Sequence, residues 1–231
     1  YDGKRNKITF LKTRFPEARM RLDRFLIDYY ADAKDLEEIC DLVDDLDVEE
    51  RHEFDRIGMT ARRKRAVAKL ILKRQLQGGW EIERTLAPVF TQSVSAHDTR
   101  SIGRRFREIS PRVTEDADTH RLVCGIANMV HEVRPEATKL QMTLHFMFVF
   151  ADALSEGDNS PEGIHRDGTD YIVSALVVER AGILGGESVV YAHNKKTEYL
   201  RYTLQPGEGL FQDGRHYWHY VTPVIKDPAV P

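Results

Sequence analysis

Strict alternation of apolar and polar residues from 140 to 146 is the clearest structural pattern in the chain. A period of two places successive side chains on opposite faces of a β-strand, so a strand is predicted here. The polar members of the pattern share one face of this strand: Gln141, Thr143 and His145. Such a face is suited to lining a cavity or to forming cross-strand hydrogen bonds, and the pattern leaves both roles open.

Further strand-like segments follow, separated by the turn signals GILGG, HNKK and QPGEG. Gly, Pro and Asn are the residues that most often interrupt regular structure. The predicted strands span residues 171–179, 187–192, 197–204, 209–212 and 217–221. Because a short helix near 120–130 precedes them and almost no helix separates them, we expect antiparallel pairing in a jelly roll or barrel.

The N-terminal third has a pattern typical of amphipathic helices. Between residues 16 and 78 the apolar residues recur three or four positions apart. They include Leu22, Phe25, Leu26 and Tyr29 in one stretch and Ala68, Leu72 and Leu76 in another. We therefore predict an α+β protein with a helical region over residues 1–85 and a jelly-roll domain over residues 86–231. The helical region is a candidate lid, dimerisation element or docking surface.

Charge and composition narrow the range of partners. The 34 basic and 37 acidic residues leave a formal charge of −3, which argues against a nucleic-acid-binding protein acting through bulk charge. No apolar run approaches the roughly 18–20 residues needed to cross a bilayer, and the N-terminus lacks a signal-peptide core. We expect a cytoplasmic protein with no membrane partner. Cys40 and Cys124 are far apart, as is typical of reduced thiols.

The sequence PEGIHRDGT places a histidine and an aspartate on either side of Arg166. In an extended segment residues i and i+2 point to the same side, so His165 and Asp167 can face one metal ion while Arg166 points away. An imidazole and a carboxylate are two of the three protein ligands in the facial triad of non-haem Fe(II) oxygenases. A pair with this spacing also arises by chance, so the motif alone is equally consistent with a charged turn.

A second histidine is needed, and GRHYWHYVTPV contains two. His216 and His219 are three residues apart on a predicted strand, so they face opposite sides and only one can be the ligand. We favour His219 because it lies deeper in the strand, whereas His216 adjoins the turn at Asp213 and Gly214. The alternative for each histidine is an ordinary structural role in the core or in a turn.

These motifs together resemble a known family. The segments PEGIHRDGTDYIV, GILGGESVVYAHN and LQPGEGLFQDGRHYWHYVTPV, with RRFREI upstream, resemble the bacterial 2-oxoglutarate and iron dioxygenases that hydroxylate free amino acids, the isoleucine dioxygenase type. The resemblance covers roughly residues 100–225. It implies a double-stranded β-helix, or jelly-roll, fold with Fe(II) held by His165, Asp167 and His219.

By the same resemblance, 2-oxoglutarate and O2 are cosubstrates. The implied reaction hydroxylates an unactivated C–H bond of a free L-amino acid or close derivative and releases succinate and CO2. Halogenating relatives replace the metal-binding carboxylate with a small residue, so the aspartate at position 167 favours hydroxylation. Glu162 is a candidate contact for the substrate amine, and Gln141 and Thr143 are candidate substrate contacts.

The sequence departs from the family pattern in one respect. The family's arginine for the far carboxylate of 2-oxoglutarate lies beyond the distal histidine, but only Lys226 follows it here, and the chain stops at Pro231. A C-terminal strand that carries the arginine is therefore expected to be missing from this chain. Other candidates for cosubstrate binding are Arg104, Arg107 and Thr222.

Two other functions fit the same sequence. The iron chemistry can act on a protein-bound or carrier-bound residue, with the charged N-terminal region as the docking surface. Alternatively, the chain is a non-catalytic metal-binding jelly roll that recruits a partner. A homodimer formed through the N-terminal helices is compatible with all three functions.

Overall fold

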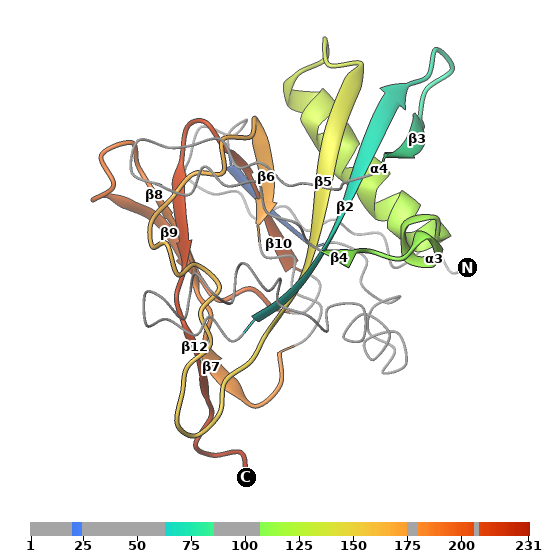
Figure 1. The fold of residues 1–231 in the computed structure, drawn as a ribbon. Helices are drawn as coiled ribbons and strands as arrows, with labels where there is room; N and C mark the ends of the chain where they lie inside the picture. The colour runs from blue at the N-terminus through green and yellow to red at the C-terminus, as the bar shows by residue number, and fades with distance from the viewer. Residues whose placement is uncertain (1–19, 25–62, 86–106, 175–179, 206–207) are drawn as a thin grey trace.

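The computed structural model describes residues 20–24, 63–85, 107–174, 180–205 and 208–231. Nearly half of these residues lie in strands, and one long helix packs against one of the sheets (Figure 1). The elements are β1 (Met20–Arg24), β2 (Arg63–Arg74), β3 (Trp80–Thr85), β4 (Arg107–Glu108), α3 (Pro111–Thr114), α4 (Ala117–Val133), β5 (Lys139–Val149), β6 (Tyr171–Ser174), β7 (Ile183–Gly185), β8 (Ser188–Tyr191), β9 (Glu198–Tyr202), β10 (Glu208–Asp213), β11 (Trp218–Val221) and β12 (Val224–Lys226).

One sheet has the order β3-β2-β4, and β5 also pairs with β2. The β2–β5 pairing is antiparallel and runs from Arg63 opposite Val149 to Lys73 opposite Lys139. Helix α4 covers one face of this sheet (Figure 1). The apolar residues of the predicted β5 alternation contribute to that packing: Leu140, Met142 and Leu144 lie against a core that includes residues of β2 and α4. The strand predicted at residues 140–146 and the helix predicted near 120–130 are thus confirmed.

The helix expected up to Gly78 is wrong where the structure describes it, because residues 63–74 form strand β2. Residues four apart lie on one face of a helix, but they also lie on one face of a strand. Burial alternates from Ala68 to Leu72: Ala68, Leu70 and Leu72 are buried, whereas Lys69 and Ile71 are only partly buried, which is a period of two. Leu22 likewise lies in a strand, β1.

The remainder of the expected helical region lies outside the described residues, and its role as lid, dimer interface or docking surface stays a prediction. Because β2 and β3 belong to the sheet that contains β5, that sheet takes strands from both sides of the boundary expected between residues 85 and 86. Among the described helices, none combines the length and apolar character needed to cross a membrane.

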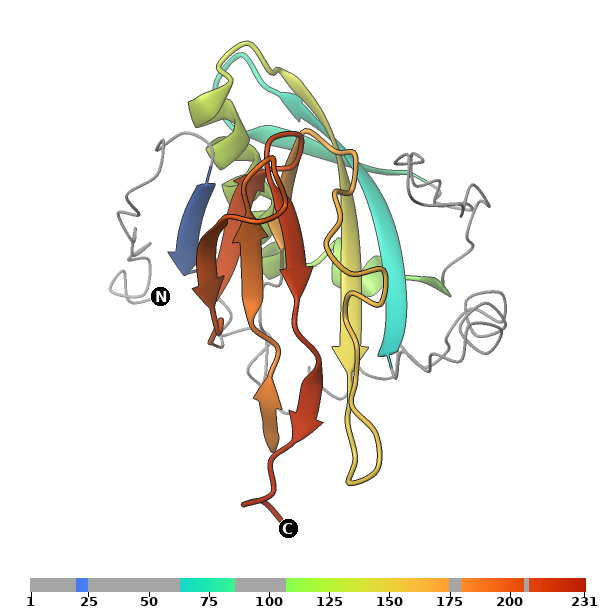
Figure 2. The same cartoon turned by 90° about the vertical axis from the view of Figure 1, so that its left-hand side faces the viewer.

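The strands predicted after residue 170 are present, as β6 and β8 to β11, although residues 175–179 lie outside the described part. They form antiparallel sheets with the orders β1-β10-β6 and β11-β8-β9, and β12 pairs with β7. Figure 2 shows β7 and β12 as a two-stranded ribbon near the C-terminus.

Strand β10 packs on both of its faces. Phe211 contacts a core that includes Met129 and Val130 of α4. Leu210, on the opposite face, packs with Val190 of β8 and with Tyr217. Residues i and i+2 of a strand share a face. The side chain of Gln212, two residues beyond Leu210, therefore points into the interior between β10 and the β11-β8-β9 sheet.

Gly185 shows why the GGES turn contains glycine. Its φ angle is +77°, and a Cβ at this position would collide with the carbonyl oxygen of Pro223. Only glycine accepts both the positive φ and the close backbone approach. The turn therefore packs directly against the chain that follows β11.

Candidate metal centre

The segment that contains His165 is held along β11 by backbone hydrogen bonds. His165 and His219 exchange both of their bonds, with N–H to carbonyl distances of 3.0 Å in each direction. Gly157 and Val224 make a second reciprocal pair, at 2.9 and 2.8 Å. Between these pairs, the Ser160 hydroxyl accepts a bond from the backbone N–H of Val221 at 3.2 Å. Since β8 occupies the other edge of β11, the HxD segment lies beside the strand that carries the distal histidine.

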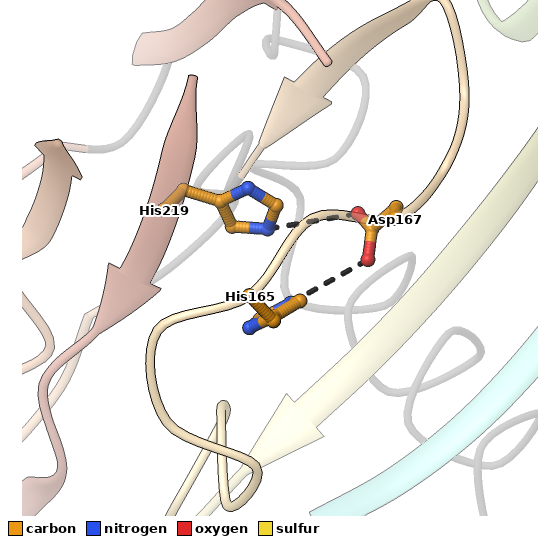
Figure 3. Close-up of side chains that lie close together, drawn as sticks. All are labelled: His165, Asp167 and His219. Carbon is orange, nitrogen blue, oxygen red and sulfur yellow. Dashed lines mark ion pairs between the residues drawn. The ribbon is translucent and has the colours of Figure 1, made fainter. Parts of the chain in front are cut away.

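His165, Asp167 and His219 converge on one point (Figure 3). Their candidate ligand atoms all lie within 4.8 Å of one another. Nε2 of His165 is 3.4 Å from Oδ1 of Asp167, and Nε2 of His219 is 3.6 Å from Oδ2 of the same carboxylate. Two atoms bound at about 2.1 Å and at right angles on one ion would be about 3 Å apart, so both histidine–aspartate pairs are within about 0.6 Å of the separation expected on a metal.

Arg166 points to the other side of the segment, as predicted. Its guanidinium lies 4.4 Å from the ring centroid of Trp218. It also contacts Nδ1 of His193 at 3.1 Å and donates to the carbonyl oxygen of His216 at 3.2 Å. His216 is in the turn after β10, where its N–H bonds to Asp213. Of the two histidines, His219 and not His216 therefore belongs to the candidate metal cluster.

The outer nitrogen of each histidine has a hydrogen-bonding partner. Nδ1 of His165 lies 2.8 Å from the carbonyl oxygen of Gly163. A carbonyl only accepts, so this nitrogen carries the proton and Nε2 is available to a metal. Nδ1 of His219 lies 3.1 Å from the side-chain amide of Gln212. Metal-binding histidines generally have such a partner, because it orients the ring and selects the tautomer.

The three side chains of the cluster strongly affect one another's pKa values. Burial favours the uncharged form of His165, but the hydrogen bond to Asp167 and the charges of Glu162 and Asp167 outweigh it and raise the pKa of His165 to about 8. Burial would raise the pKa of Asp167, but His165 and His219 lower it to about 2. Burial dominates at His219 and lowers its pKa to about 4, so its ring is neutral near pH 7.

One predicted substrate contact, Glu162, lies beside the cluster, and the polar face of β5 carries the other two. Oε1 of Glu162 lies 3.2 Å from Nε2 of His165, and the Glu162 side chain is 20% exposed. The charge of His145 acts on Asp167. The polar face of β5, which contains Gln141 and Thr143 as well as His145, is opposite the face that packs on α4.

The structure gives no contact between the predicted cosubstrate-binding residues and the cluster among the residues that it describes. The hydroxyl of Thr222 accepts a hydrogen bond from the N–H of Glu187 at 2.9 Å, so it contributes to the GGES turn. Arg104 and the side chain of Arg107 lie outside the described residues. Their roles stay predictions.

Sequence reasoning missed Gln212 and the carbonyl oxygen of Gly163. Nothing in a sequence identifies a backbone carbonyl as a histidine partner. A signal for Gln212 was present, because it is a polar residue at the end of the apolar run Gly209–Phe211 in a predicted strand. It is fully buried, which is unusual for an uncharged amide without a specific partner.

The family model for 2OG-Fe dioxygenases matches residues 48–230. The chain belongs to this family. The 2OG-Fe dioxygenases use Fe(II), 2-oxoglutarate and O2, so the predicted cofactors are confirmed. The family has a jelly-roll fold, which agrees with the antiparallel strand pattern. The match also extends N-terminal to the segment that carries the sequence resemblance, and it includes β2 and β3.

Solved structures share this fold. A BsmA homologue from Methylobium petroleophilum PM1 has a TM-score of 0.67 at 19% identity, over 88% of this chain and 79% of that one. IDO from Bacillus thuringiensis has a TM-score of 0.55 at 13% identity, over 89% and 86%. The Fe(II)/(alpha)ketoglutarate-dependent dioxygenase TqaL has a TM-score of 0.54 at 14% identity, over 87% and 69%. No curated protein matches the chain significantly.

Proposed function

We propose that this 2OG-Fe dioxygenase hydroxylates an unactivated C–H bond of a free L-amino acid or a close derivative. The observation that carries the proposal is the convergence of His165, Asp167 and His219, with the Glu162 carboxylate beside them. Two imidazoles and one carboxylate are the donor set of the facial triad, which leaves three positions of the ion open for cosubstrates. When bound, Fe(II) supplies the oxidative decarboxylation of 2-oxoglutarate and the coupled hydroxylation.

In this proposal His165 and His219 bind the metal through Nε2, and Asp167 binds through a carboxylate oxygen. Both rings present Nε2 to that carboxylate. The backbone pairing of the two histidines sets their rings on one side of the sheet at a centroid separation of 4.3 Å. These three side chains would hold the ion, and its remaining positions would be open to cosubstrates.

Glu162 is proposed to bind the ammonium group of the substrate. Its Oε1 is 3.2 Å from the metal-facing nitrogen of His165, so an amine bound there lies next to the metal. A cation held by a carboxylate in a partly buried position gains a charge-assisted hydrogen bond. This arrangement favours an amino acid over an uncharged substrate, because only a cationic group gains a charge-assisted hydrogen bond from the carboxylate.

The polar face of β5 is proposed to form another side of the substrate site. Gln141 and Thr143 lie on this face, and His145 is close enough for its charge to affect Asp167. Amide, hydroxyl and imidazole groups suit the carboxylate and polar atoms of an amino acid. Arg104, Arg107 and Thr222 remain the proposed contacts for 2-oxoglutarate.

Turnover assays test the proposal directly. The protein would be incubated with Fe(II), 2-oxoglutarate, O2 and each standard amino acid, and products would be screened by mass spectrometry for the gain of one oxygen atom. Succinate should form in proportion to the hydroxylated product, and neither should form with His165→Ala. Anaerobic Fe(II) and 2-oxoglutarate should also give a visible charge-transfer band that this variant lacks.

Two additional assay arms separate the alternatives. If the enzyme turns over only a peptide or a carrier-bound amino acid, the proposed free amino-acid substrate is wrong, but the proposed iron and 2-oxoglutarate chemistry stands. Chloride added to the same assay would yield a chlorinated product if the reaction were halogenation. Absence of both the band and succinate in a folded sample would contradict catalysis and support a binding role.

A further inference from the structure

Gln212 lies at a position where strand β10 meets the strand of the distal histidine. It is two residues beyond Leu210, so its side chain points into the interior between β10 and the β11-β8-β9 sheet. Its amide reaches Nδ1 of His219 at 3.1 Å. The hydrogen bond therefore links two separate sheets at the metal-binding ring.

Gln212 is a polar residue in the core, and its burial requires a physical explanation. The residue is 0% exposed, and its neighbours on the strand, Leu210 and Phe211, are apolar core residues. Burial of an amide costs free energy unless its polar atoms form hydrogen bonds. Its Oε1 atom has no hydrogen-bond partner. Among the described residues, His219 is thus the one hydrogen-bond partner of the Gln212 side chain.

The orientation of the amide determines which nitrogen of His219 can bind a metal. A neutral imidazole carries one N–H, and the other nitrogen has a lone pair. If Nε2 of Gln212 donates to Nδ1 of His219, the proton of the ring is on Nε2, and that atom cannot bind metal. If the amide is rotated by half a turn, Oε1 accepts from Nδ1–H, and the lone pair of Nε2 points at Asp167.

No partner of Oε1 in the described residues holds the amide in the first orientation. The oxygen and nitrogen of a glutamine amide are assigned from the hydrogen bonds that they make. Metal binding selects the second orientation, because an ion held between Nε2 of His219 and Oδ2 of Asp167, which are 3.6 Å apart, requires a lone pair on that nitrogen. His165 already has the corresponding arrangement, in which the Gly163 carbonyl accepts from Nδ1.

We propose that Gln212 is a positioning residue of the metal centre. Its side-chain oxygen accepts a hydrogen bond from Nδ1–H of His219, which sets the tautomer and the rotation of the ring so that Nε2 is presented to the ion. The inference rests on the proposed metal ligands. It assigns no contact between Gln212 and the metal, 2-oxoglutarate or the substrate.

The first test uses the wild-type, metal-free protein and needs no variant to fold. Long-range 1H–15N correlation spectra near neutral pH distinguish the two tautomers of His219. The proton is expected on Nδ1. A spectrum with the proton on Nε2 would overturn the inference, whatever the outcome of the turnover assays.

The second test measures Co(II) affinity by the visible absorption of the bound ion. Gln212→Leu removes the acceptor at similar volume and should weaken Co(II) binding about 10- to 100-fold, the usual cost of losing a partner of a metal-bound histidine. Gln212→Glu retains an oxygen acceptor and should bind Co(II) more tightly than Gln212→Leu. Gln75→Leu, at an exposed turn far from the cluster, is the matched control and should leave affinity unchanged.

The outcomes separate this inference from the proposed function. If wild type binds Co(II) and forms succinate but Gln212→Leu binds equally well, the positioning role is wrong and the function stands. Equal losses in Gln212→Glu and Gln212→Leu would also overturn the role, because an acceptor oxygen would then make no difference. If wild type fails to bind Co(II) or Fe(II), the proposed function fails, while the tautomer spectrum still reports on the hydrogen bond.

Discussion

His165 and His219 exchange both backbone hydrogen bonds at 3.0 Å, and their rings lie 4.3 Å apart on one side of the sheet. Residues far apart in the sequence are thereby fixed opposite each other, and the position of one ring depends on the strand that carries the other. Asp167, two residues after His165, completes the cluster from the same side of its segment.

Replacement of Asp167 by alanine should abolish succinate formation. The change removes one of three ligands and the carboxylate that balances the charge of the ion. We expect at least a tenfold loss of Co(II) affinity, measured by absorption titration. Asp170→Asn is the matched control, because Asp170 is an exposed carboxylate on the same segment that pairs with Arg215. Equal behaviour of the two variants would rule out Asp167 as a ligand.

Metal affinity should depend on pH through His165. With a pKa of about 8, this ring is protonated in the metal-free protein at lower pH, and a metal must displace that proton. His219, with a pKa of about 4, is already neutral, and Asp167, with a pKa of about 2, is already ionised. Affinity should therefore rise about tenfold per pH unit up to about pH 8 and then level off.

This dependence is measurable by Co(II) titration between about pH 6 and pH 9; about one proton should be released on binding well below pH 8, and few or none near pH 9. Calorimetry in buffers of different ionisation enthalpy gives the proton count independently. A flat profile below pH 8 would mean that His165 is neutral in the metal-free protein. Release of two protons would mean that His219 is also protonated.

Glu162→Gln should separate substrate binding from metal binding. The amide has nearly the same shape but no charge, so it cannot pair with an ammonium group. KM for the amino acid should rise about 10- to 100-fold, as expected for loss of a hydrogen bond to a charged group. Co(II) affinity and KM for 2-oxoglutarate should change little. A large fall in Co(II) affinity would instead identify Glu162 as a metal ligand.

Gly185→Ala should destabilise the fold. The new Cβ would collide with the carbonyl oxygen of Pro223, and φ is +77°. We expect a loss of at least about 2 kcal/mol in the free energy of unfolding, seen as a fall in Tm of about 4–8 °C. Gly125→Ala in α4 is the control, because no atom lies within 4 Å of its added Cβ. That change should stabilise the protein by about 0.5–1 kcal/mol.

Unchanged Tm in Gly185→Ala would show that the GGES turn can relax away from the segment after β11. A fall in Tm for Gly125→Ala as large as that for Gly185→Ala would point to a general intolerance of substitution. The comparison is made without added metal, so that ligand binding does not contribute to stability.

The strand pattern of β5 was predictable because the two faces of this strand have different surroundings. In β5 the apolar residues pack on α4 and the polar ones do not, so the alternation is visible in the sequence. Strand β2 was not predictable in this way. Ala68 and Leu72 are four residues apart, a spacing that fits a helix and a strand equally well, and its antiparallel pairing with β5 decides between them.

The sequence by itself determined that His165 and Asp167 share a side and that Arg166 does not, because extended chain alternates its side chains. It also identified the strand that carries His219. Only the tertiary structure decided that this strand lies beside the HxD segment and that Gln212 on another sheet reaches the same ring. The physical reason is that backbone pairing and sheet packing join distant parts of the chain, whereas residue periodicity reports only on local geometry.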